Sequence, residues 1–124
     1  DVLLIATGET VQRAYLAAQI LEQNKIHATV ISMHTIKPFD DETFLNEAKK
    51  AKVIVSIEEH SIYGGLGEQC ASLIAQNKIN TCFQILGIPD EYMINGSQSD
   101  VLDHYNMSPE KISKTVTDLL LIDK

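Results

Sequence analysis

Apolar runs and helical repeats alternate along the whole chain. Runs rich in β-branched residues predict strands at 2–6, 26–33, 52–57 and 81–88, and the first is apolar throughout, as in a strand buried on both faces. Between them, apolar residues recur at helical spacing near 11–24, 41–50 and 67–78, and two more helices are predicted after Ser97 and Ser108. Thr7 or Thr10 is expected to cap the first helix, Asp40 or Asp41 the second, and Ser97 and Ser108 the last two.

Strands that alternate with helices predict a three-layer α/β/α fold. Right-handed crossovers make most of such a sheet parallel. A short fifth strand is expected near Asn80, between the third helix and the strand at 81–88. No repeat, linker or low-complexity segment divides the chain, so residues 1–124 are predicted to form one domain.

Charge and length narrow the class of protein. The net charge of −7 argues against non-specific binding to nucleic acid or anionic membranes, and Arg13 is the one arginine. The chain carries no apolar run near membrane-spanning length and no signal peptide pattern, which predicts a cytoplasmic protein. Cys70 and Cys82 match no metal or redox spacing and are predicted to be buried, reduced thiols. Because the chain begins at Asp1, directly before a strand, we expect a piece of a longer protein.

The candidate chemistry lies where the third strand ends. Glu58, Glu59 and His60 follow an apolar run, at the carboxyl edge where open α/β sheets bind ligands. Alternation along the strand places Glu58 and His60 on one face and Glu59 on the other. These groups could act in acid–base chemistry, but we favour a polar strand end that contacts the following turn or a neighbouring domain. A metal site built from Glu58, His60 and His34 has no supporting spacing.

A glycine turn follows, with Gly64, Gly65 and Gly67 before a helix. Such a turn can bind phosphate at the helix N-terminus or allow close backbone packing. Glu68, just inside the helix, would occupy the helix dipole and repel an anion, so packing is favoured. Gly8 lacks the remaining glycines of a dinucleotide fingerprint, which leaves it as a tight strand-to-helix turn.

Taken together, these motifs resemble the C-terminal domain of the transketolase family. The same domain ends deoxyxylulose phosphate synthases and the β subunits of 2-oxoacid dehydrogenases. The likeness covers nearly the whole chain and is strongest to the small C-terminal subunit of split transketolases. It is carried by Asp1–Gly8, His34–Pro38, Glu58–Gly67 and Leu86–Asp90.

The resemblance implies a mostly parallel, five-stranded mixed sheet whose first strand in space is antiparallel to the others. It also implies a homodimeric parent enzyme of pentose phosphate metabolism that moves a two-carbon ketol unit between sugar phosphates. That parent would hold thiamine diphosphate and Mg²⁺ in other domains. The present fragment would then bind no cofactor, carry no catalytic residue and supply dimer or interdomain contacts. The candidate contact residues are Glu58, Glu59, His60, Tyr63, Gly64, Gly65, Gly67 and Glu68.

Two hypotheses from other classes remain open. The glycine turn could serve a stand-alone module that senses anions or binds proteins. The alternation of strands and helices also fits a small nucleotide-binding domain of flavodoxin type, although the acidic charge and the missing phosphate loop count against it.

Overall fold

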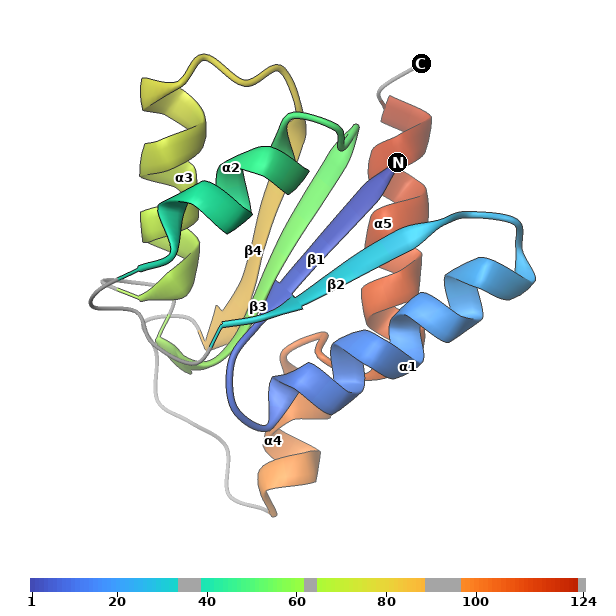
Figure 1. The fold of residues 1–124 in the computed structure, drawn as a ribbon. Coiled ribbons are helices and arrows are strands. Elements are labelled where there is room, and N and C mark those ends of the chain that lie inside the picture. Colours follow the sequence, from blue (N-terminus) through green and yellow to red (C-terminus); the bar gives the residue numbers. More distant parts are fainter. Residues whose placement is uncertain (34–38, 62–64, 89–96, 123–124) are drawn as a thin grey trace.

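A parallel sheet of four strands lies between two layers of helices (Figure 1). The computed structural model describes residues 1–33, 39–61, 65–88 and 97–122, without the side chains of residues 60, 61 and 98. The strand order is β2-β1-β3-β4, and all three neighbouring pairs are parallel. The strands are β1 (Val2–Ala6), β2 (Ala28–Ser32), β3 (Val53–Ser61) and β4 (Cys82–Ile88).

Five helices complete the described part of the fold. They are α1 (Thr10–Gln23), α2 (Asp41–Ala48), α3 (Leu66–Gln76), α4 (Gln98–His104) and α5 (Pro109–Ile122). Helices α1 and α5 cover one face of the sheet, and α2 and α3 cover the other (Figure 1). Of the helices in these four ranges, none combines the length and the apolar character needed to cross a membrane.

The apolar run of β1 lies at the centre of both cores. Val2, Leu4 and Ala6 pack in the core beneath α1 and α5, whereas Leu3 and Ile5 pack in the core beneath α2 and α3. None of these five side chains is more than 2% exposed. Burial on both faces explains why this strand has no polar position.

The prediction of a five-stranded mixed sheet is wrong for the described residues, whose four strands are all parallel. Asn80 lies in the short link between α3 and β4. The Ile79 amide donates to the Ile74 carbonyl at the end of α3, over 3.1 Å, and Cys82 already pairs with the carbonyl of Lys52, over 3.0 Å. The ends of the helix and the strand therefore leave no room for a separate strand at Asn80.

Three predicted helix caps are confirmed. The Asp40 carboxylate accepts from the Thr43 amide at 3.2 Å, and the hydroxyls of Ser97 and Ser108 accept from the amides three residues further on. Each cap satisfies a backbone donor that the first turn of a helix leaves without an internal partner.

The predicted threonine cap of α1 is wrong. Glu9 occupies the N-cap position and its side chain makes no capping hydrogen bond. The Thr10 hydroxyl instead donates to the carbonyls of Thr7 and Ile57, at 2.6 and 2.8 Å. This buried contact ties the start of α1 to the middle of β3, 47 residues away in sequence.

Candidate functional site

Glu58 turns inward from the end of β3 and caps α3. Its side chain is buried, with the residue 1% exposed. One carboxylate oxygen, Oε1, accepts from the Leu66 amide at 3.0 Å, and the other, Oε2, accepts from the Gly67 amide at 2.8 Å. A carboxylate here satisfies two free donors and lies at the positive end of the helix dipole. The start of α3 therefore already carries the buried Glu58 carboxylate, in addition to Glu68, which lies in the first turn as predicted.

Glu59 points to the opposite face of β3, as strand alternation predicted. Its Oε1 lies 2.5 Å from the position that a Cβ on Gly8 would take. Gly8 has a φ of +54°, in the left-handed region that side chains rarely adopt. The turn between β1 and α1 thus brings its backbone against the Glu59 carboxylate, and a side chain at position 8 would be strained and would meet that carboxylate.

The glycine turn allows close packing inside the fold. Gly65 is the N-cap of α3. At Gly67, a Cβ would lie 2.6 to 2.9 Å from three side-chain carbons of Ile85 on β4. Carbon atoms pack at about 3.5–4.0 Å, so no larger residue fits without displacing Ile85. The geometry at Gly67 supports packing over phosphate binding.

Several predicted site residues are not covered. The side chain of His60, together with Tyr63, Gly64 and His34, lies outside the described residues. The predicted interface role of this group, and the disfavoured site from Glu58, His60 and His34, stay untested. Within residues 1–33, 39–61, 65–88 and 97–122, no cluster of three or more His, Cys, Asp or Glu could hold a metal ion.

The two cysteines differ in burial. Cys70 on α3 is a buried thiol, as predicted, whereas Cys82 at the start of β4 is half-buried and not fully buried as predicted. Burial raises the pKa of the Cys70 thiol to about 12, and the nearby Glu58 carboxylate adds to the rise. A thiol with so high a pKa has almost no thiolate near neutral pH, so Cys70 is a packing residue rather than a nucleophile.

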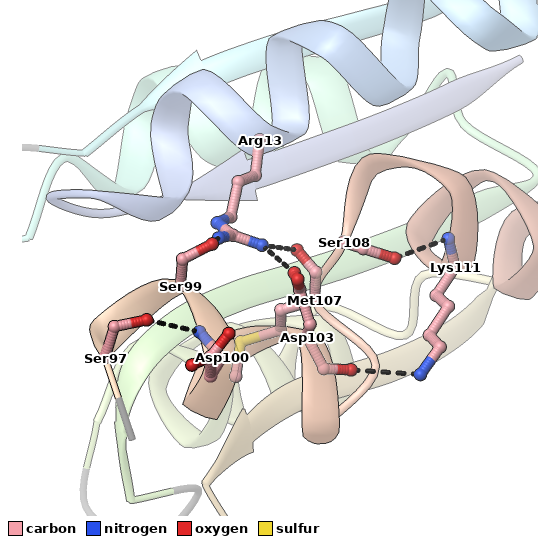
Figure 2. Close-up of polar contacts among 8 residues, drawn as sticks. All are labelled: Arg13, Ser97, Ser99, Asp100, Asp103, Met107, Ser108 and Lys111. Atoms are coloured by element: carbon pink, nitrogen blue, oxygen red, sulfur yellow. Dashed lines mark hydrogen bonds and ion pairs between the residues drawn. The ribbon is translucent and has the colours of Figure 1, made fainter.

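Arg13 has a structural role that the sequence pattern missed. Its side chain, on α1, is only 16% exposed. One guanidinium nitrogen, Nη1, donates to Asp103 Oδ1 at 2.6 Å and to the Met107 carbonyl at 3.1 Å, and Nη2 donates to Ser99 Oγ at 3.0 Å (Figure 2). The single arginine thus connects α1 to α4 and to Met107, in the segment between α4 and α5. The one feature of the sequence that could have indicated this role is that Arg13 is the single arginine.

The chain is a parallel α/β domain, and the backbone amides at its glycine turn bind the Glu58 carboxylate of the same chain. Residues 1–112 match the family described as transketolase, C-terminal domain. The chain belongs to this family.

Relatives in sequence support the same assignment. The chain is 40% identical over 117 residues to the putative transketolase C-terminal section of Methanocaldococcus jannaschii, covering 94% of this chain and 36% of that protein. It is 37% identical over 120 residues to a subunit of the apulose-4-phosphate transketolase of Phocaeicola vulgatus, covering 97% and 38%. It is 32% identical over 124 residues to 1-deoxy-D-xylulose-5-phosphate synthase of Heliobacterium modesticaldum, covering 100% and 19%. The chain thus spans well under half the length of each relative.

Solved structures agree on the fold. A split-gene transketolase described as an inactive β4 tetramer superposes with a TM-score of 0.87 at 27% identity, over 100% of this chain and 40% of that one. A Pichia stipitis transketolase solved with sedoheptulose-7-phosphate has a TM-score of 0.69 at 21% identity, over 98% and 16%, a likeness of fold alone.

Proposed function

We propose that the chain is a non-catalytic C-terminal domain of a transketolase-type enzyme that transfers a two-carbon ketol unit between sugar phosphates. In this role it supports the assembly of the parent enzyme, a dimer formed with the remaining domains or with a separate subunit. The observation that carries the proposal is the Glu58 contact. In a chain that belongs to this family, the motif with the most chemistry binds its own helix through the Leu66 and Gly67 amides.

The described residues do not fit thiamine diphosphate or Mg²⁺. A pyrophosphate at the glycine turn would compete with the Glu58 carboxylate for the same backbone donors. The described part of the chain also offers no cluster of metal-binding side chains. In our proposal the cofactor and its metal are therefore held by other parts of the parent enzyme, and no catalytic step is assigned to this chain.

What the chain contributes is a stiff edge at the carboxyl ends of its strands. Glu58 and Gly67 fix the start of α3 against β3 and β4. Glu68, in the first turn of α3, is exposed at this edge. In the proposal, Glu59, Glu68 and the neighbouring His60 contact the rest of the enzyme.

The alternatives receive less support. An anion-sensing module built on the glycine turn would need donors that Glu58 already engages. A parent of the deoxyxylulose phosphate synthase type is supported by the 32% identity to the Heliobacterium modesticaldum enzyme, but the two transketolase relatives show higher identity. We keep the split transketolase as the preferred parent.

Calorimetry tests the absence of a cofactor site. We expect no heat of binding when thiamine diphosphate and Mg²⁺ are titrated into the purified 124-residue chain. Stoichiometric binding would contradict the proposal. The anion-sensing alternative is tested by titrating sulfate and following amide resonances, which would shift around residues 65–68 if it were correct.

Complementation tests the assembly role. Adding the chain to the remaining part of the parent enzyme should produce a stable complex with ketol transfer activity. His60→Ala in the complete enzyme should weaken assembly, measured by sedimentation, while turnover per assembled enzyme stays constant. Loss of turnover in an intact assembly would instead assign chemistry to His60.

A further inference from the structure

An open groove lies between α1 and the end of β2, beside the turn from β1 to α1. Its volume is about 740 Å³, and it lies on the face of the sheet that α1 covers. The lining residues that matter here are Gly8, Val11, Tyr15, Val30, Ser32 and Glu59.

The topology makes this groove a favourable place for a ligand. The connection from β1 leads through α1 to β2 on one side, and the connection from β3 leads through α3 to β4 on the other. Chain connections therefore diverge between β1 and β3, and ligands of open α/β sheets bind at the carboxyl ends of the strands at such a point. Gly8 follows β1 and Glu59 lies near the end of β3, so both belong to this divergence.

The groove joins a carboxylate to an apolar wall. Val11 and Val30 are half-buried in it, and Tyr15 is 56% exposed beside them, the largest exposed apolar side chain on α1. Glu59 supplies negative charge to the groove, and the exposed Glu9 also lines it. Among the described lining residues none is Lys, Arg or His, so a phosphate or sugar phosphate would meet repulsion rather than a partner.

We propose that this groove binds an ammonium or guanidinium group carried on a short apolar stem. A carboxylate with an aromatic ring nearby is a common combination for a cation, through charge-assisted hydrogen bonds and the face of the ring. The two valines provide the surface for the stem. A carboxylate has about four acceptor sites, which a ligand donor would share with the contacts that Glu59 makes within the chain.

The proposed site shares Glu59 with the assembly role but can be tested apart from it, because the test requires no other part of the parent enzyme. It uses the 124-residue chain, labelled with ¹⁵N, and three probes of the same shape. Butylammonium carries the positive charge, 1-butanol is neutral and butyrate is negative. A blocked lysine tripeptide forms a fourth arm, which distinguishes a free small cation from a basic side chain of another polypeptide.

We expect butylammonium to cause saturable changes in chemical shift that cluster at the amides of Gly8, Val11 and Ser32. Butyrate should not cause these changes. Glu59→Gln should weaken binding about fivefold, the upper range for an ion pair open to solvent. Tyr15→Leu should weaken it about threefold, as expected for a lost cation–π contact. Glu42→Gln, which removes an exposed negative charge of α2 on the other face of the sheet, should leave binding unchanged.

Three results would overturn the proposal. The first is the absence of saturable shifts in the groove with both butylammonium and the lysine tripeptide. The second is binding of 1-butanol or butyrate as strong as that of butylammonium. The third is butylammonium binding that Glu59→Gln leaves unchanged. If the groove binds the cation, the relative affinities of butylammonium and the tripeptide show whether the cation comes from a small molecule or from a basic side chain of another polypeptide.

Discussion

Replacing Glu58 with Gln measures how much the buried cap of α3 contributes to stability. The substitution keeps the shape of the side chain but exchanges one acceptor oxygen for an NH₂ group. That group would face the amide of Leu66 or Gly67, which now donates to the carboxylate over 3.0 or 2.8 Å. One hydrogen bond to a charged group is lost, and a buried backbone donor is left facing another donor.

The magnitude follows from the burial of this contact. A hydrogen bond to a charged group contributes about 1.5–3 kcal/mol. An anion at a helix N-terminus adds up to about 2 kcal/mol in partly buried sites. Desolvation of the native carboxylate offsets part of this sum, because the residue is 1% exposed. We therefore expect Glu58→Gln to lower the free energy of unfolding by about 2–3 kcal/mol.

Urea unfolding followed by far-UV circular dichroism provides the assay. With a urea dependence of about 1–2 kcal/mol per M, the midpoint should fall by about 1–3 M at unchanged slope. Glu68→Gln is the matched control, because Glu68 is an exposed carboxylate in the first turn of the same helix. Its cost should stay below about 1 kcal/mol. Equal effects of the two variants would refute the structural role of Glu58 and favour the interdomain role.

Three further predictions concern packing, the helix anchor and the thiols. Gly67→Ala should cost about 1–3 kcal/mol, measured by urea unfolding, since its methyl group would lie 2.6 Å from Ile85 Cγ2. Arg13→Lys should cost about 1 kcal/mol and lower Tm by about 4 °C in a thermal scan, because lysine cannot reproduce the planar fork of donors. Cys70, with its pKa raised to about 12, should resist Ellman's reagent at pH 8 in the folded protein, where Cys82 reacts first.

Each of these has a control. The double variant of Gly67→Ala with Ile85→Ala should lose less than the sum of the single variants, and strict additivity would argue against the contact. Lys114→Gln removes an exposed pair with Asp118 and should cost less than about 0.5 kcal/mol. If Arg13→Lys costs no more than Lys114→Gln, the contacts of Arg13 with α4 contribute little to stability. Both cysteines should react in urea, and equal native reactivity would contradict the burial of Cys70.

The arrangement of strands and helices was largely predictable, because both follow from periods in the sequence. The apolar β1, the helical repeats and the polar caps at Asp40, Ser97 and Ser108 each depend on residues close together in the chain. The start of α1 was not predictable in the same way. Thr10 has the side chain of a helix cap, but its hydroxyl donates to a strand 47 residues away. Local propensity favoured the cap, and a tertiary contact replaced it.

The candidate site was predictable in position but not in its pairing. The sequence placed carboxylates and glycines at one strand end and put Glu58 and Glu59 on opposite faces. It did not indicate which acidic residue would meet the helix, and Glu68 was favoured because it lies inside the first turn. The structure extends β3 to Ser61, beyond the predicted end at residue 57. Glu58 is consequently still in the strand and points beneath the start of α3, where an exposed first-turn residue such as Glu68 cannot reach.

This pairing bears on how glycine turns are interpreted. A glycine turn before a helix binds phosphate through backbone amides and the helix dipole. Both the amides and the dipole are local to the turn and its helix. Here the Glu58 carboxylate occupies them, and it lies eight residues before Leu66 and nine before Gly67. A buried acid on the preceding strand therefore converts a potential anion site into a fixed joint between strand and helix. By the same reasoning, ligand binding in this fold should be sought on the other face of β3, where Glu59 lines an open groove instead of a helix terminus.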